Sequence, residues 1–349
     1  TLSLHDALPI SNCVEECYPI LKGVLLSLLP NRFEQELSDL NAIVSAFTLP
    51  DWEEYSSFEL QRLFNALVMD ADGQDDVYST PESIRELMCR LINPLENMYI
   101  ADLFSGAGSC LARVFEEYKS LNPILYGEEI NFDMFGISNM LFIINEVSNV
   151  QVAQRNVYTN SEADFERFDN VIMDSPFALS VTIEDASVYK YGLPSKSAAD
   201  WANYQIALSK LKPTGRAIAT TSAGGLNRAS DIKIREGLIN DDLVEAVIML
   251  PSSMYANTAI PTAIIVFNKR KAESIKNKVI MIDASERFIR KNRRQNSLTQ
   301  ETINRIIDVV QNGTEEKQFS TVVDLETLRK NEYNRSEEHT SELQSLSHL

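Results

Sequence analysis

The stretch Asp102-Leu-Phe-Ser-Gly-Ala-Gly-Ser109 joins a strand-like run, 99–104, to a helical pattern that begins near residue 109. Glycines at such a turn let the backbone approach a ligand closely, and the helix that follows presents its N-terminal amides there. By themselves the two glycines are compatible with a methyl donor, a dinucleotide or a plain tight turn. Two details favour a methyl donor: Leu111 stands where the dinucleotide fingerprint has its third glycine, and Asp102 can pair with an ammonium group.

Strand-like runs alternate with helical patterns along the rest of the chain. The runs cover 124–130, 150–156, 169–175, 216–222, 243–250, 262–269 and 279–285, and further helices are expected from about 132 and around 199–211 and 231–240. This alternation predicts an α/β fold with a doubly wound, Rossmann-like, mostly parallel sheet and helices on both faces. Ligands of such sheets bind beyond the carboxyl ends of the strands, which is where 102–109 falls.

Shifts in composition divide the chain into regions. Residues 12–76 carry apolar positions at helical spacing and are expected to form a partial helical N-terminal region, which ends in the charged linker DADGQDDV at 70–77. The α/β domain is expected over 77–285. A helical C-terminal extension, with helices near 299–312 and 323–330, is expected over 286–334.

The two ends of the chain have an unusual sequence. TLSLHDALPI at 1–10 and RSEEHTSELQS at 335–345 both read as translations of a common sequencing adapter. We therefore expect 1–11 and 335–349 to be artefacts and 12–334 to be an internal fragment of a longer protein.

Composition excludes several kinds of chemistry. His5, His339 and His348 are the only histidines and all fall in the expected artefacts, which excludes histidine triads, imidazole bases and histidine-ligated zinc. The four cysteines indicate neither a disulfide framework nor a metal site and fit a reducing cytoplasm. No uncharged apolar run approaches the roughly 18 to 20 residues that span a bilayer. The net charge of −18 argues against stand-alone DNA binding, because affinity for nucleic acids rests on lysine and arginine.

Acidic residues end two further strand-like runs. Glu128 and Glu129 end the run 124–130, about 20 residues past the glycines, where a carboxylate can accept both hydroxyls of a ribose. The alternative is a solvated pair of glutamates. The run 169–175 leads into Asp174-Ser175-Pro176-Phe177, which resembles the catalytic Asn/Asp-Pro-Pro-Phe/Tyr motif of amino-methyltransferases.

The order of these motifs is similar to that of the methylation subunits of type I restriction-modification systems, in the N-6 adenine-specific DNA methylase family. The Thr-Pro element of that family is matched within Tyr78-Ser79-Thr80-Pro81, its Gly-Gln-Glu-hydrophobic-Asn element by 127–131, and the similarity covers roughly 77–334. The resemblance identifies 77–285 as a methyltransferase domain. It implies methyl transfer from S-adenosylmethionine to the exocyclic amine of adenine in DNA, with a specificity subunit and a restriction subunit as partners and no membrane.

The resemblance also implies roles for individual residues. Asp174, Ser175, Pro176 and Phe177 would be catalytic: the amine donates to the Asp174 side chain and the Ser175 carbonyl, and Phe177 stacks on the flipped base. No metal is implied. The residues implied to bind S-adenosylmethionine are Tyr78, Thr80, Pro81, Asp102, Phe104, Ser105, Gly106, Gly108, Ser109, Glu129 and Asn156.

Some positions depart from the family's pattern. Ser175 replaces the first proline of the catalytic motif, Asn156 stands where an aspartate is common, and Ser79 where an aromatic residue is common. These departures favour an alternative, a degenerate methylase fold that acts as a scaffold or binding module. A nicotinamide-dependent dehydrogenase would explain the glycine loop but not the motif 174–177. The basic cluster RFIRKNRR at 287–294 can contact phosphates or be a solvated loop.

Overall fold

The computed structural model describes residues 80–159, 166–177, 179–183, 186–195, 199–256 and 258–331. The predicted helical region 12–76, the two predicted artefacts at 1–11 and 335–349, and the predicted site residue Tyr78 lie outside the described residues.

One large sheet organises the described part of the chain. Its nine strands run in the order β11-β8-β6-β7-β5-β4-β1-β2-β3. Every neighbouring pair is parallel except those that involve β7 and the edge pair β11·β8. The predicted α/β fold with a mostly parallel sheet is therefore confirmed. The strands are β1 Tyr99–Asp102, β2 Ile124–Glu129, β3 Val150–Gln154, β4 Phe168–Met173, β5 Leu211–Ser222, β6 Val244–Met249, β7 Thr262–Asn268, β8 Lys278–Asp283 and β11 Ser320–Asp324.

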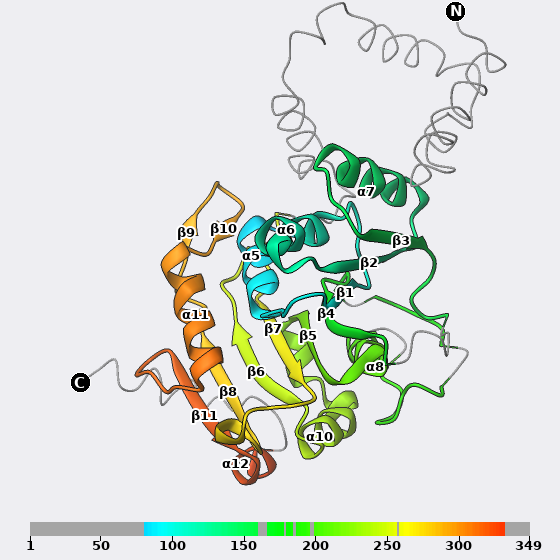
Figure 1. Cartoon of the computed structure of the whole chain (residues 1–349). Helices are drawn as coiled ribbons and strands as arrows, with labels where there is room; N and C mark the ends of the chain where they lie inside the picture. Colours follow the sequence, from blue (N-terminus) through cyan, green and yellow to red (C-terminus); the bar gives the residue numbers. More distant parts are fainter. Residues whose placement is uncertain are drawn as a thin grey trace, which may run out of the picture.

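Helices cover both faces of this sheet (Figure 1). One face packs against α5 Glu82–Leu91, α6 Ser109–Tyr118, α7 Phe132–Ile144 and α11 Gln300–Asn312. The other packs against α8 Asp200–Lys210, α10 Ile232–Asn240 and α12 Leu325–Lys330. The shorter helices are α9 Ala223–Asn227 and the 3-10 turns η4 Lys119–Leu121, η6 Ala229–Asp231 and η7 Glu273–Ile275.

Strand β7 shows why the chain forms two cores. Its side chains point alternately to the two faces, because successive residues of a strand lie on opposite sides. Ile264 and Val266 enter the core under α5, α6 and α11, whereas Ile265 and Phe267 enter the core under α8 and α10. All four are buried. A continuous apolar run is thus what a central strand covered on both faces requires.

The C-terminal region partly differs from the prediction. The helices expected near 299–312 and 323–330 are present as α11 and α12, but residues 323–324 belong to β11, and no strand was predicted there. Strand β11 pairs antiparallel with β8 at the edge of the sheet. Its run Ser-Thr-Val-Val-Asp is short and largely polar, so only the long-range pairing with β8 identifies it as a strand. A small hairpin of β9 Ile289–Arg290 and β10 Asn296–Ser297 was not predicted either.

The topology places the ends of seven strands along one edge. Strands β1, β2, β3, β4, β5, β6 and β8 run in the same direction, because each is parallel to a neighbour or shares the antiparallel partner β7. Their carboxyl ends therefore meet at one edge, where ligands bind in such sheets. The longest helices that the structure describes have 13 residues, and no helix in the described ranges is long and apolar enough to cross a bilayer.

Candidate functional site

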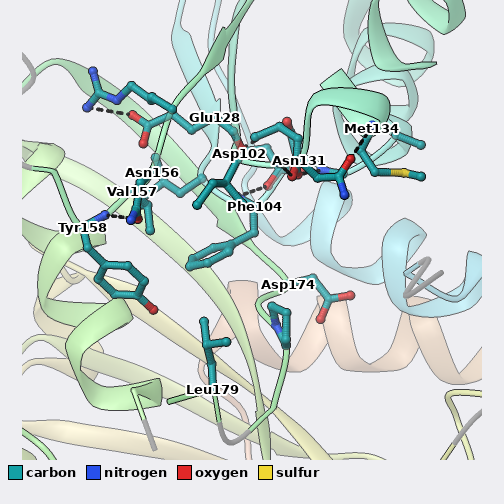
Figure 2. A pocket seen from close by; sticks show the side chains of 18 of the residues that line it. Asp102, Phe104, Glu128, Asn131, Met134, Asn156, Val157, Tyr158, Asp174 and Leu179 are labelled. Carbon is teal, nitrogen blue, oxygen red and sulfur yellow. Dashed lines mark hydrogen bonds and ion pairs between the residues drawn. The ribbon is translucent and has the colours of Figure 1, made fainter. Parts of the chain in front are cut away.

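A cavity of about 620 Å³ opens at the carboxyl edge, beyond β1, β2, β3 and β4. Its volume falls within the roughly 300 to 1,000 Å³ typical of small-molecule sites. Figure 2 shows the ring of Phe104 in the middle of the view, with Tyr158 to its left and Asp174 and Leu179 below. The cavity is thus built from segments that follow three or more strands, as expected where a parallel sheet binds a ligand.

The glycine loop between β1 and α6 closes one side of the cavity. Gly108 has φ 83° and precedes α6, and a Cβ there would lie 2.5 Å from Cζ of Phe142 on α7. Only glycine permits both this backbone conformation and this close approach. Gly106 has φ 50°, and its missing Cβ would meet no atom within 4 Å. Gly108 therefore allows the loop to pack closely against α7, whereas Gly106 leaves open space beside the cavity.

Asp102 ends β1 at the cavity wall and is 3% exposed. Burial raises the pKa of its carboxyl to about 7; the amide of Phe104, which donates to Asp102 at 3.1 Å, lowers it, and the charges of Asp174 and Glu129 raise it. A cation in the cavity would reverse this shift, because it favours the ionised carboxylate. The cavity is therefore electrostatically suited to a positively charged ligand.

The two glutamates that end β2 have different partners. Glu128 is buried and forms ion pairs with Nζ of Lys210 at 2.7 Å and with Arg155 at 3.2 Å. Glu129 accepts the backbone N–H of Gly106 at 2.8 Å and that of Asn131 at 2.6 Å. It thereby fixes the glycine loop to the end of β2. Each carboxylate oxygen has a second lone pair, so Glu129 can also accept hydroxyl groups from a ligand.

The catalytic motif predicted from the sequence follows β4. Oδ1 of Asp174 accepts the hydroxyl of Thr220 at 2.5 Å and that of Tyr255 at 2.8 Å, and the Thr80 hydroxyl also donates to this carboxylate. Burial raises the pKa of Asp174, whereas the three hydroxyl donors lower it. The carboxylate is therefore held as a hydrogen-bond acceptor in a buried place.

A chain of hydrogen bonds joins the cavity wall to this motif. The hydroxyl of Tyr158 donates to Oδ1 of Asn203 at 2.6 Å, and Nδ2 of Asn203 donates to Oγ of Ser175 at 3.1 Å. Asn203 on α8 is fully buried, and Ser175 is 5% exposed. The serine that replaces the family's proline is thus held by a side chain that the sequence did not indicate.

Ten of the predicted site residues line the cavity together. They are Thr80, Asp102, Phe104, Ser105, Gly106, Ser109, Glu129, Asn156, Asp174 and Pro176. Pro81 lies directly before α5, and Ser175 is buried behind the wall. Phe177 packs edge-on against Tyr255, with 5.2 Å between the ring centroids.

Several residues around the cavity were not predicted. Thr220 and Tyr255 reach Asp174 from β5 and from the segment 251–255 after β6. A signal for both was present, since β5 and β6 were predicted strands whose carboxyl ends meet the same edge. Other lining residues to which no role was assigned are Leu103, Ala107, Cys110, Ile130, Asn131, Met134, Arg155, Val157, Tyr158, Leu179, Ser180, Val181 and Thr182. Glu128, which was considered together with Glu129, also lines the cavity.

Residues 63–348, most of the chain, match the model of the family described as N-6 DNA methylase. The chain belongs to this family. The match includes every residue around the cavity, from Thr80 through the turn after β4 to Tyr255. The cavity thus lies entirely within the part of the chain that matches the family.

Similar proteins agree with this membership. The chain is 28% identical over 337 residues to the type I restriction enzyme MjaVIII methylase subunit of Methanocaldococcus jannaschii, covering 88% of this chain and 57% of that protein. The type I restriction-modification system methyltransferase subunit of Streptococcus thermophilus has the same fold, with TM-score 0.82, 20% identity, and coverage of 96% of this chain and 76% of that one. The chain spans about half to three fifths of the length of the curated relatives that it matches.

A third similarity concerns the cofactor class of the fold. A Listeria monocytogenes protein described as a class I S-adenosylmethionine-dependent methyltransferase aligns with TM-score 0.60 at 18% identity, covering 88% of this chain and 94% of that one. The sheet of this chain is therefore the S-adenosylmethionine-dependent methyltransferase fold, and its relatives are methylase subunits of type I restriction enzymes.

Proposed function

We propose that this chain forms the S-adenosylmethionine-binding core of a DNA methyltransferase that modifies the exocyclic amine of adenine as the modification subunit of a type I restriction-modification system. The observation that carries the proposal is the single cavity edge that brings Asp102, Glu129 and Asp174 together. Family membership supports the same reaction.

The residues around the cavity fit S-adenosylmethionine. The ligand carries a positive ammonium and a positive sulfonium, and the wall presents the carboxylates of Asp102, Glu129 and Asp174. Asp102 would hold the ammonium, Glu129 the ribose hydroxyls and Asn156 the adenine. Gly106 leaves room for the ligand where a Cβ would otherwise project. When bound, the ligand supplies an activated methyl group.

The motif after β4 would position the target base. The amine of adenine is a poor nucleophile because its lone pair is delocalised into the ring, and hydrogen bonds to the Asp174 side chain and the Ser175 carbonyl would localise that lone pair. Thr80, Thr220 and Tyr255 orient the Asp174 carboxyl, and their hydrogen bonds lower its pKa against the larger effect of burial, which raises it. Phe177 would stack on a base flipped out of the duplex. Such a transfer depends mainly on positioning, so it requires no histidine.

The proposal includes partners that supply what the chain lacks. A net charge of −18 is unfavourable for DNA binding by the chain alone. We propose that a specificity subunit supplies sequence recognition and further contacts to DNA, that a restriction subunit completes the system, and that the assembly works on DNA in the cytoplasm.

A binding and transfer experiment tests the proposal. Calorimetry should show S-adenosylmethionine binding to the chain, and binding should weaken by at least about tenfold in Asp102→Ala but not in Asp308→Asn, an exposed acidic residue on α11. The full-length subunit with its specificity partner should transfer labelled methyl to DNA. If neither the chain nor the complex binds the donor at saturating concentration, the fold acts as a scaffold and the proposal is wrong.

A further inference from the structure

The hairpin that follows β8 carries the densest run of basic residues in the described part of the chain, RFIRKNRR at 287–294. We define the basic hairpin as residues 287–297, which include β9 and β10. Its five cations are all exposed: Arg287, Arg290, Lys291, Arg293 and Arg294. None of the five forms an ion pair with another of the residues that the structure describes; Arg287 lies 5.8 Å from the ring centroid of Phe319. In a chain of net charge −18, a cluster of five exposed cations forms a local site that can attract a negatively charged partner.

The basic hairpin stands at the same edge of the sheet as the cavity. It continues directly from the carboxyl end of β8, which is parallel to β6, and Figure 1 shows it projecting at the upper left of the molecule. Phe288 and Ile289 on this hairpin are 40% and 55% exposed. Exposed cations beside exposed apolar side chains are typical of a binding surface rather than a packed loop.

Hydrogen bonds tie the base of the hairpin to the elements that hold Asp174. Asn296 donates through its backbone N–H to the carbonyl of Ser253 at 2.7 Å and through Nδ2 to that of Ser252 at 2.9 Å. Nε2 of Gln295 donates to the carbonyl of Met254 at 3.0 Å. The next residue is Tyr255, whose hydroxyl donates to Asp174. The hairpin is thus fixed relative to the predicted catalytic residue.

On the other side, the hairpin is tied to the segment that holds Thr80. The backbone N–H of Leu298, directly after the hairpin, donates to Oγ of Ser83 at 3.2 Å. Ser83 lies in the first turn of α5, just after Thr80. Hydrogen bonds on two sides therefore fix the position of the hairpin, and of a ligand bound to it, relative to Asp174.

We propose that the basic hairpin binds the sugar-phosphate backbone of DNA beside the base that enters the cavity. This inference rests on the proposed function, which requires a duplex at this edge. Four of the five cations are arginines, whose planar guanidinium groups pair with phosphate oxygens through two hydrogen bonds. The hairpin supplies phosphate contacts that fix register and carry no sequence information, so it complements a separate specificity subunit.

The salt dependence of DNA binding tests this assignment. Each phosphate contact contributes about 0.9 to the slope of log affinity against log salt. Assembled with the specificity subunit, the double variant Arg290→Gln/Arg293→Gln should therefore bind a short duplex more weakly than the wild type, with a slope smaller in magnitude by about 2. The matched control, Lys233→Gln/Lys276→Gln, removes the same charge from α10 and from the residue that follows η7. It should keep the wild-type slope.

The outcomes separate this inference from the proposed function. The hairpin inference is overturned if the two double variants, each assembled with the specificity subunit, show the same slope. It is also overturned if the arginine variant alone fails to assemble with the specificity subunit, since the surface would then bind protein. Calorimetry with S-adenosylmethionine should give the wild-type affinity for both double variants, and absence of binding to the wild type would instead contradict the proposed function.

Discussion

Replacing Asn203 with leucine tests the hydrogen-bond chain between the cavity wall and the catalytic motif. Leucine has the same branching and the same number of side-chain heavy atoms as asparagine but can make neither of the two hydrogen bonds to Tyr158 and Ser175. The hydroxyl of Ser175 then stays buried without its donor, because this residue is 5% exposed. The hydroxyl of Tyr158 lies at the cavity wall and can turn to water.

The expected loss of stability follows from the difference in exposure between the hydroxyls of Ser175 and Tyr158. A buried polar group without a partner costs about 1 to 3 kcal/mol, and a group that reaches water costs less. Asn203→Leu should therefore lower the free energy of unfolding by about 2 to 4 kcal/mol. Loss of the Ser175 contact also loosens the turn after β4, and small displacements of a reacting group can cost up to about a hundredfold in rate. Affinity for S-adenosylmethionine should change little.

A second substitution distinguishes positioning from general destabilisation. Ser175→Pro introduces the proline of the motif that this segment resembles. It also removes the hydroxyl to which Asn203 donates a hydrogen bond. In the Asn203→Leu background it should recover most of the methyl-transfer rate, measured by single-turnover labelling with the specificity partner. Asn170→Leu, a buried asparagine at the amino end of β4, should lower stability without lowering the transfer rate. A wild-type rate in Asn203→Leu, or no recovery in the double variant, would refute the reasoning.

Four further substitutions give three independent tests. Asp102→Asn should stabilise the ligand-free chain above about pH 7, because asparagine stays neutral where the buried aspartate ionises. Folding raises the pKa of the Asp102 carboxyl from 3.8 to about 7. The stability that the protonated carboxyl contributes is therefore fully present below about pH 4 and is lost as the pH rises through about 7. Urea unfolding at about pH 8 should show a gain on the order of 1 to 3 kcal/mol, and a loss would contradict this account. Tyr255→Phe removes a donor from the ionised form of Asp174, so the acid limb of the pH–rate profile should move to higher pH; an unchanged inflection would show that this hydroxyl does not act on the carboxylate. Gly108→Ala places a methyl group 2.5 Å from an aromatic carbon of α7 at φ 83° and should cost about 2 kcal/mol or more. Gly106→Ala has open space and should cost less in thermal unfolding; equal losses would contradict the packing role of Gly108.

Local patterns in the sequence predicted most of the sheet. The apolar runs that became β1, β2, β4, β6 and β7 are covered on both faces, so their composition alone identifies them as strands. Strand β11 was missed because its short polar run becomes a strand only through pairing with β8. The beginning of β5 was also missed, because Leu-Lys-Pro-Thr-Gly at 211–215 has the composition of a loop.

The candidate site was predictable to the extent that it depends on residues next to strand ends. Asp102, Glu129 and Asp174 each follow a recognisable strand, and the parallel topology brings them together. Asn203 and Tyr255 could not be identified in the same way. Asn203 lies in the middle of a helix, and its role depends on contacts with residues 28 and 45 positions away. Such contacts have no periodic signature in a single sequence.

Calorimetric titration of S-adenosylmethionine near pH 7, repeated in two buffers of different ionisation enthalpy, tests the central claim most directly. The account predicts that the ligand's positive charge ionises Asp102, whose pKa is about 7 in the free chain, so binding should release protons and the measured heat should depend on the buffer. Asp102→Asn should remove both the proton release and most of the affinity. Binding that is independent of buffer and unaffected by this substitution would contradict the assignment of this cavity as the methyl-donor site.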